Sequence, residues 1–329
     1  MSDLRAIPKI ELHLHMEGAA PPAFARALAA RKGRSIDALI DPRTGRYAWS
    51  DFSSFLAAYD AVAALFDTPQ DNRDLAEAVL RECAAHGVIY AEIFISPDHA
   101  GADPVAWAEY LAAICEGAAA AEAACGIVAR FIPLCVRGLG PEAAMRAARL
   151  AVAAEDPRIV GFGMAGDERM FDPADFAPAF ALAREAGLKL TAHAGEFGGA
   201  DSVRRALDAL GLDRVDHGVR AVEDPDLVAR LAREGVPLAV CPGSNVALGV
   251  VPDWAAHPID ALRRAGVRVT VSTDDPPFFD TDMTREHEML SRHFGYGPDD
   301  HLALARAALD AAFCAPDLKR RLGARLAAA

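Results

Sequence analysis

No segment constrains the fold more than the run Lys9-Ile10-Glu11-Leu12-His13-Leu14-His15. Residues two apart on a β-strand project from the same face, so the two histidines at the end of this run converge. Two converging imidazoles form half of a transition-metal site, although two buried structural histidines would give the same pattern. Three later strand-like runs, at residues 190–196, 215–218 and 271–276, also end in metal-binding or proton-transfer side chains. Together they favour a metal site.

Short apolar runs alternate with amphipathic helical patterns along the chain. Strands are predicted to end near His15, Ile95, Leu134, Met164, Ala194, His217, Val240 and Ser272. Helices are predicted over residues 72–85, 104–124, 141–153, 173–186, 201–210 and 225–234. Eight strand-then-helix units indicate an α/β fold, a (β/α)8 TIM-type barrel, more than an open sheet. Residues 21–69 are too many for one helix and predict extra helices inserted after the first strand, as a lid.

The composition is that of a single barrel domain spanning residues 1–329, because no repeat or long linker interrupts the chain. A net charge of −13 argues against a nucleic-acid partner. Residues 1–8 lack signal-peptide features, and Glu116 and Glu122 interrupt the apolar stretch 111–128, so no membrane span is predicted. Six cysteines without a CxxC pair predict reduced thiols and a cytoplasmic location. The oligomeric state is not predicted.

The barrel hypothesis brings distant residues together, since barrel enzymes carry their catalytic groups at the C-terminal ends of the strands. His13, His15, His193, His217 and Asp274 would then meet at one mouth. A set of three of these imidazoles and the carboxylate would suit Zn²⁺, with one coordination position left for water. Such an ion lowers the pKa of its water towards ~7.

These residues resemble the adenosine deaminase family of the amidohydrolase superfamily. The resemblance follows the chain in order through Pro8-Lys9-Ile10-Glu11-Leu12-His13-Leu14-His15-Met16-Glu17-Gly18, Met164-Ala165-Gly166-Asp167-Glu168, His193-Ala194-Gly195-Glu196, Asp216-His217-Gly218-Val219, Cys241-Pro242-Gly243-Ser244-Asn245 and Ser272-Thr273-Asp274-Asp275-Pro276. It implies a barrel with one Zn²⁺ per chain, a small-molecule purine substrate, and hydrolytic removal of the 6-amino group by attack of zinc-bound hydroxide on C6.

The resemblance also implies a role for each matched residue. The zinc ligands are His13, His15, His193 and Asp274. Glu196 passes a proton to ring N1, and burial would give it the raised pKa that this needs. His217 orients the hydroxide. One ligand, His15, is also expected to contact the substrate.

The remaining matched residues bind the substrate. Asp275 hydrogen-bonds N7 of the base, Gly166 offers its backbone N–H to N3, and Glu17 lies near the sugar. Each has a simpler explanation: Asp275 could form an N-cap pair with Asp274, Gly166 could serve a turn, and Glu17 could form a structural salt bridge. His86, His99, His257, His287, His293 and His301 are predicted to be ordinary surface or helix residues.

Two residue patterns that are missing from the sequence exclude related classes of metal-dependent enzyme. Residues 159–164 at the fourth strand contain no lysine, which binuclear superfamily members carboxylate to bridge two metals, so one metal is preferred. The H-x-E and P-C-x-x-C ligands of cytidine deaminases are also missing, because Cys241 has no second cysteine nearby.

The substrate expected from the sequence is adenosine, with 2′-deoxyadenosine, giving inosine and deoxyinosine. Two departures favour the alternative, adenine deaminase: Gly163 stands where many adenosine deaminases carry aspartate, and Asp216 precedes His217 as in the adenine deaminase branch. AMP ranks third because no compact basic cluster is aimed at a phosphate. Hydrolysis of another amide or amidine, or a purine- or metal-binding barrel without catalysis, also stays open.

Overall fold

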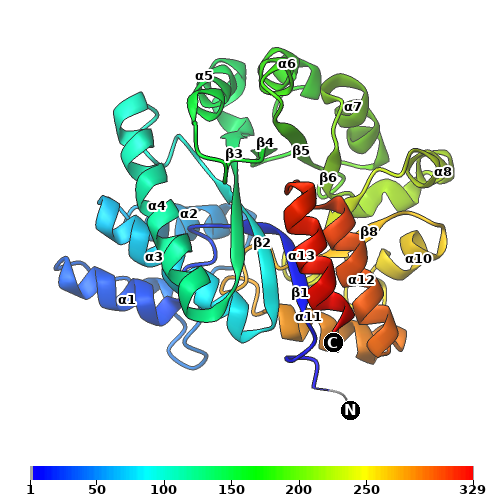
Figure 1. Cartoon of the computed structure of the whole chain (residues 1–329), viewed down its shortest axis with the longest axis horizontal. Coiled ribbons are helices and arrows are strands. Elements are labelled where there is room, and N and C mark those ends of the chain that lie inside the picture. The colour runs from blue at the N-terminus through cyan, green and yellow to red at the C-terminus, as the bar shows by residue number, and fades with distance from the viewer. Residues whose placement is uncertain (1–2, 329) are drawn as a thin grey trace.

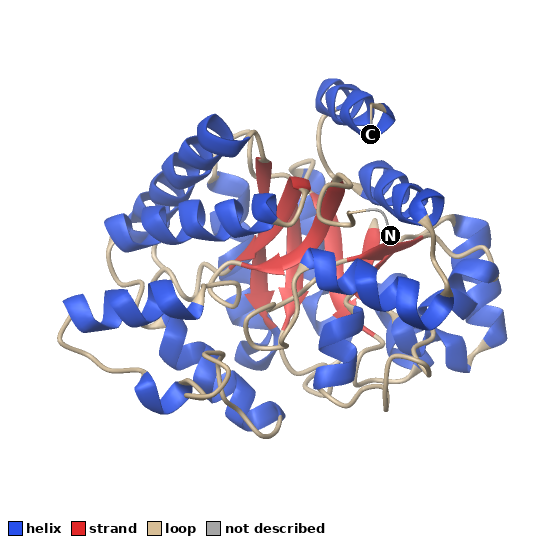
Figure 2. Cartoon of the chain, turned by 90° about the horizontal axis from the view of Figure 1, so that it is seen from below, coloured by secondary structure: helices blue, strands red, loops and turns tan. Residues whose placement is uncertain are grey.

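The computed structural model describes residues 3–328, which contain an eight-stranded parallel sheet in the order β1 to β8 (Figure 1). The strands are β1 (Lys9–His15), β2 (Val88–Ile95), β3 (Val128–Val136), β4 (Gly161–Ala165), β5 (Lys189–Ala194), β6 (Arg214–His217), β7 (Leu238–Val240) and β8 (Val269–Val271). Helices surround these central strands in both views (Figures 1 and 2). The predicted (β/α)8 TIM-type barrel is confirmed.

The α-helices lie between the strands and after β8, and several begin at capping signals that the sequence carries. They are α1 (Pro22–Arg31), α2 (Phe52–Ala63), α3 (Pro69–Ala85), α4 (Pro104–Cys125), α5 (Gly140–Ala153), α6 (Ala177–Glu185), α7 (Ala200–Leu210), α8 (Pro225–Glu234), α9 (Pro242–Ala247), α10 (Ile259–Arg264), α11 (Met283–Phe294), α12 (Pro298–Ala311) and α13 (Pro316–Ala327). Thr68 caps α3 and Asp103 caps α4, each followed by proline in the first helical turn. The predicted insertion after the first strand contains α1 and α2.

The barrel closes between β1 and the residues that follow β8. The backbone N–H of His15 donates to the carbonyl of Asp274 at 3.1 Å, and the N–H of Asp274 donates to the carbonyl of His13 at 3.0 Å. Asp274 therefore lies directly beside both histidines of β1 at the C-terminal edge of the sheet.

The strands are buried on both faces, as parallel barrel strands must be. All eight residues of β2 are buried. On β1, Ile10 and Leu12 point outward and pack with Leu309 of α12 and Leu322 of α13. The alternate residues Glu11, His13 and His15 are left facing the barrel interior.

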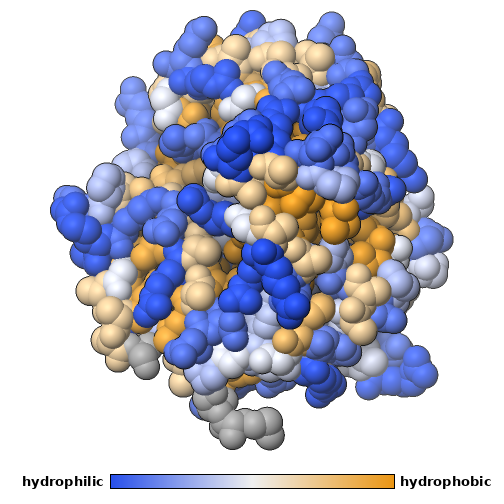
Figure 3. Space-filling model, turned by 90° about the vertical axis from the view of Figure 1, so that its right-hand side faces the viewer, coloured by the Kyte–Doolittle hydropathy of each residue, from blue (hydrophilic) through white to orange (hydrophobic). Residues whose placement is uncertain are grey.

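The surface is mostly polar on the side shown in Figure 3, with apolar side chains between the hydrophilic ones. Across residues 3–328, no helix has both the length and the apolar character required to span a bilayer.

Several boundaries differ from the prediction. The helix predicted over residues 173–186 is divided into a 3-10 helix η3 (Pro173–Phe176) and α6, because Pro178 has no N–H and is accommodated only in a first turn. β3 and β4 extend to Val136 and Ala165, past Leu134 and Met164, while β8 ends one residue before Ser272.

Candidate active site

A cavity opens at the C-terminal ends of the strands, under α2 of the inserted segment. Eight of the nine residues that the sequence predicted for the site line this cavity: His15, Glu17, Gly166, His193, Glu196, His217, Asp274 and Asp275. The ninth, His13, is fully buried and lies against Asp274. Phe52, Phe55 and Tyr59 of α2 contribute to the wall, so the insertion covers the cavity as predicted.

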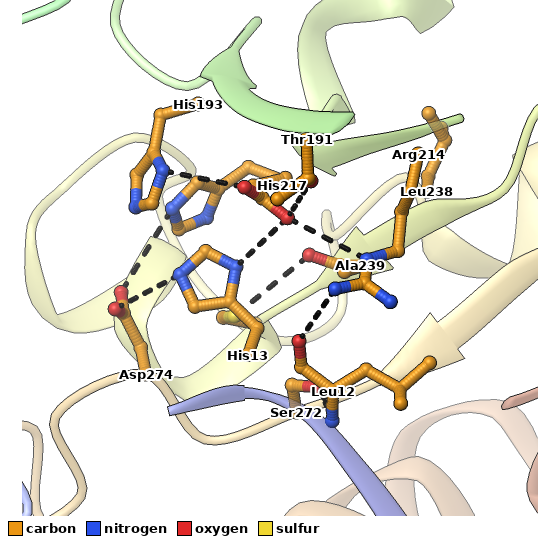
Figure 4. Close-up of polar contacts among 12 residues, drawn as sticks. Leu12, His13, Thr191, His193, Arg214, His217, Leu238, Ala239, Ser272 and Asp274 are labelled. Atoms are coloured by element: carbon orange, nitrogen blue, oxygen red, sulfur yellow. Dashed lines mark hydrogen bonds and ion pairs between the residues drawn. The ribbon is translucent and has the colours of Figure 1, made fainter. Parts of the chain in front are cut away.

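Histidine side chains converge on the carboxylate of Asp274 (Figure 4). Its Oδ1 lies 3.2 Å from Nε2 of His13 and 3.3 Å from Nε2 of His15, and its Oδ2 lies 3.9 Å from Nε2 of His217. One ligand atom from each of His13, His193, His217 and Asp274 falls within 4.8 Å of the others. This compact group includes His217 in place of the predicted His15, which instead groups with Asp274 and Asp275.

These donors fit a divalent cation. Nε2 of His13 is buried and has no hydrogen-bond partner. Buried polar atoms are rarely left without partners, so a group that accepts imidazole lone pairs completes this site better than protein alone. Several imidazoles beside one carboxylate are the donor set that Zn²⁺ prefers.

Asp216 lies behind two of these histidines and was not predicted to belong to the site. Its carboxylate oxygens are 3.7 Å from Nδ1 of His13 and 3.6 Å from Nδ1 of His193. Thr191 donates its hydroxyl to Asp216 at 2.7 Å, and Nε of Arg214 is 3.8 Å from the same carboxylate. Burial raises the pKa of Asp216, but the nearby imidazoles of His193 and His13 outweigh it and hold that pKa below its usual value.

The left-handed backbone conformation of His217 explains why the neighbouring side chains of Asp216 and His217 both face the site. Strand alternation alone would send these neighbours to opposite faces. His217 has φ +62°, which breaks the alternation, and Asp274 has φ +66° beside Asp275. Non-glycine residues in this region are strained and gather at functional sites.

Glu196 is a buried carboxyl that faces His217, with 3.8 Å between its Oε1 and Nε2 of the imidazole. Burial and then the negative charge of Asp274 raise the pKa of Glu196 well above its usual value. Burial and the charge of Asp274 also raise the pKa of Asp275. Both carboxyls therefore favour the protonated form, which can donate a hydrogen bond.

A chain of hydrogen bonds determines the tautomer of His217. The backbone N–H of Ile259 donates to Nδ1 of His257 at 3.1 Å, so neutral His257 carries its proton on Nε2. That nitrogen lies 3.2 Å from Oδ1 of Asn245, and Nδ2 of Asn245 lies 3.3 Å from Nδ1 of His217. Nδ1 of His217 is thus an acceptor, which places the proton of the neutral ring on Nε2.

Several histidines predicted to be ordinary are instead buried or face the cavity. His257 is buried in the chain just described, and His86, His287 and His301 are also buried. His99 lines the cavity, while His293 is an exposed residue of α11, as predicted. These contacts join residues far apart in the chain, so local pattern gives no signal for them.

Glu17 is held by two tyrosines. Its Oε1 accepts from the hydroxyl of Tyr110 at 3.0 Å, and its Oε2 accepts from the hydroxyl of Tyr59 at 3.3 Å. Nδ1 of His99 is 3.7 Å from Oε2. Burial raises the pKa of Glu17, but hydrogen bonding to His99 outweighs this and lowers it below its usual value. A charged Glu17 therefore has partners for both oxygens.

Gly166 follows β4 with φ +102°, a conformation that favours glycine. A Cβ there would lie 3.4 Å from the backbone nitrogen of Arg137. The backbone of Gly166 forms part of the cavity wall.

A barrel with a buried cluster of histidines and aspartate at its strand ends defines a hydrolase of the amidohydrolase superfamily. A model of the adenosine deaminase family matches residues 8–329. The chain therefore belongs to this family and is an amidohydrolase-type deaminase.

Known proteins of this kind resemble the chain over nearly its whole length. An adenine deaminase of Chelativorans sp. (strain BNC1) is 51% identical over 321 residues, 97% of each chain. The crystal structure of adenine deaminase from Arthrobacter aurescens has a TM-score of 0.90 and 34% identity, covering 98% of each chain. An amidohydrolase from Burkholderia ambifaria, solved with bound Zn, has a TM-score of 0.88 and 33% identity, covering 99% of this chain and 91% of that one.

Proposed function

We propose that this protein is an adenine deaminase, which converts adenine and water to hypoxanthine and ammonia with one bound Zn²⁺. The observation that carries this proposal is the pairing of Glu17 with Tyr59 and Tyr110. Glu17 is the residue expected near a sugar, yet both of its oxygens already accept hydrogen bonds. A ribose hydroxyl would have to compete with these two tyrosine hydroxyls for the carboxylate. The 51%-identical relative named adenine deaminase supports the same substrate.

This proposal replaces adenosine, the substrate expected from the sequence, with its stated alternative. AMP is disfavoured as well, because the described residues that line the cavity include no lysine or arginine. A phosphate in protein sites is usually bound by such cationic side chains.

The proposed zinc ligands are His13, His15, His193 and Asp274. Zn²⁺ in such a site supplies Lewis acidity, which makes a water molecule acidic enough to act as a nucleophile near pH 7. In the reaction, the water oxygen bonds to C6 of the purine, the C6–N6 bond breaks, and the amino group leaves as ammonia after it gains a proton.

Glu196 is the proposed proton donor. A protonated carboxyl can donate to ring N1, which withdraws electrons from C6 and makes that carbon a better electrophile. The raised pKa of Glu196 keeps the proton available for this step.

His217 and Asp275 are proposed to orient the reactants. With its proton on Nε2, His217 can donate a hydrogen bond to the attacking oxygen. Asp275, whose pKa is also raised, can donate to N7 of the purine. Gly166 allows a backbone N–H to approach N3.

The experiment is to incubate zinc-loaded protein with adenine and to quantify hypoxanthine and ammonia. We expect the two products in equal amounts, and a decrease in kcat of at least ~10²-fold for Glu196→Gln, which keeps the shape but not the transferable proton. Glu185→Gln, at the exposed end of α6, is the matched control and should match wild type. Adenine that is left intact by the loaded protein would refute the proposal and favour a barrel without this activity.

A further inference from the structure

Glu168, the last residue of the Met164-Ala165-Gly166-Asp167-Glu168 motif, makes an unusual set of hydrogen bonds. Its Oε1 accepts from the backbone N–H of Gly195 at 2.5 Å, and its Oε2 accepts from the N–H groups of Glu196 at 3.0 Å, Phe197 at 2.8 Å and Gly198 at 2.7 Å. One buried carboxylate therefore binds four consecutive amides.

A fifth donor is the hydroxyl of Ser202 in α7, which also bonds Oε1 of Glu168. The four amides belong to the turn between β5 and α7, where neither the sheet nor a helix provides acceptors for them. A single side chain from the loop after β4 thus satisfies the whole turn.

The glycines of this turn fit the same arrangement. A Cβ on Gly198 would lie 2.7 Å from Cβ of Ser202 and 2.8 Å from Oε1 of Glu168, so a larger residue would displace the carboxylate and its serine partner. Gly195 has φ +70°, which starts the turn in the left-handed region. The two glycines of the turn therefore suit the contact between the Glu168 carboxylate and the amides of residues 195–198.

We propose that Glu168 is a positioning residue for Glu196: by binding the amides of residues 195–198, it fixes the backbone from which the proton-donating carboxyl projects. This inference rests on the proposed function, because it assigns Glu168 an effect on catalysis through Glu196. Proton transfer needs heavy atoms within about 2.6–3.2 Å, so small displacements of that backbone reduce the rate.

The first test is a double-mutant cycle between Glu168→Gln and Glu196→Gln, with adenine as substrate. The amide of glutamine would turn a donor toward backbone N–H groups, and we expect kcat to decrease ~10²-fold, the scale of a lost general acid. In the Glu196→Gln background the same change should cost less than about 3-fold, because groups that act as a unit are not additive. Zinc content should stay at the wild-type level.

A second pair of variants tests the same contact from the side of the turn. Gly198→Ala should lower kcat at least ~10-fold by displacing the carboxylate. Gly199→Ala is the matched control, since a Cβ there would meet only flexible side-chain ends of Glu223 and Arg220. Amide hydrogen exchange at residues 195–198 should accelerate in Glu168→Gln and Gly198→Ala but not in Gly199→Ala.

The outcomes separate the two proposals. Additive losses in the cycle, or wild-type kcat in both Glu168→Gln and Gly198→Ala, would overturn the role of Glu168 while leaving the adenine deaminase assignment intact. If wild-type protein leaves adenine unchanged, the proposed function fails. Amide hydrogen exchange then tests by itself whether Glu168 fixes the turn. Exchange at residues 195–198 that is the same in Glu168→Gln as in wild type would overturn this role as well.

Discussion

The carboxylate of Glu17 and the hydroxyl of Tyr110 lie 3.0 Å apart, although β1 and α4 bring them from positions 93 residues apart in the chain. Glu17 follows the histidines of β1, and Tyr110 is buried in α4. Tyr59 of α2, in the inserted segment, donates a second hydrogen bond to Glu17. This contact joins the barrel to its cover beside Glu17, the residue that the sequence predicts to lie near a sugar.

Substrate preference should therefore depend on Tyr59. We expect Tyr59→Ala to raise kcat/KM for adenosine relative to adenine by at least ~10-fold, because the change opens space and frees one oxygen of Glu17 for a hydroxyl. Tyr47→Phe is the control, since Tyr47 lies in the same insertion but bonds only the carbonyl of Ala20. Initial rates with both substrates measure the ratio, and an unchanged ratio in Tyr59→Ala would argue against this explanation of specificity.

Metal affinity should depend on Asp216. Carboxylates behind metal-bound histidines orient the rings, and their loss commonly weakens binding ~10–100-fold. We expect Asp216→Asn to weaken zinc binding by that factor in a competition with a chromophoric chelator.

Asp213→Asn is the control for this variant, because Asp213 pairs with Lys189 at the other end of β5. It should leave the Kd for zinc unchanged. Equal Kd values for Asp216→Asn and wild type would show that Asp216 does not organise the histidines.

The pH dependence of stability should show a contribution from His86. Hydrogen bonds to Asp282 and Glu82 raise the pKa of His86 to about 9 from its ordinary 6.5. A group whose folded-state pKa is raised stabilises the fold fully below the unfolded pKa, and this contribution is lost as pH rises through the folded pKa. The Tm difference between wild type and His86→Gln should be largest near pH 6 and shrink by pH 9.5. A difference that is constant across this range would contradict the assignment.

The sequence predicted the barrel and the inward histidines well because both depend on local periodicity. His13 and His15 share a face by strand alternation, and His193 and Asp274 follow apolar strands whose ends must meet at one edge of the sheet. These positions needed no knowledge of side-chain packing.

The same rules could not predict Asp216, because alternation places it opposite His217 until the left-handed φ of His217 is known. The link from His257 through Asn245 to His217 depends on two loops that meet only in the folded chain. The tyrosines that pair with Glu17 come from α2 and α4, so the sequence alone left adenosine ahead of adenine.

The most direct test of the central claim is a competition experiment with zinc-loaded wild-type protein and an equimolar mixture of adenine and adenosine. The early ratio of hypoxanthine to inosine reports the ratio of the two kcat/KM values. The account predicts that hypoxanthine exceeds inosine at least ~10-fold, since a sugar hydroxyl would have to compete with Tyr59 and Tyr110 for Glu17. Inosine in equal or greater amount than hypoxanthine would contradict it.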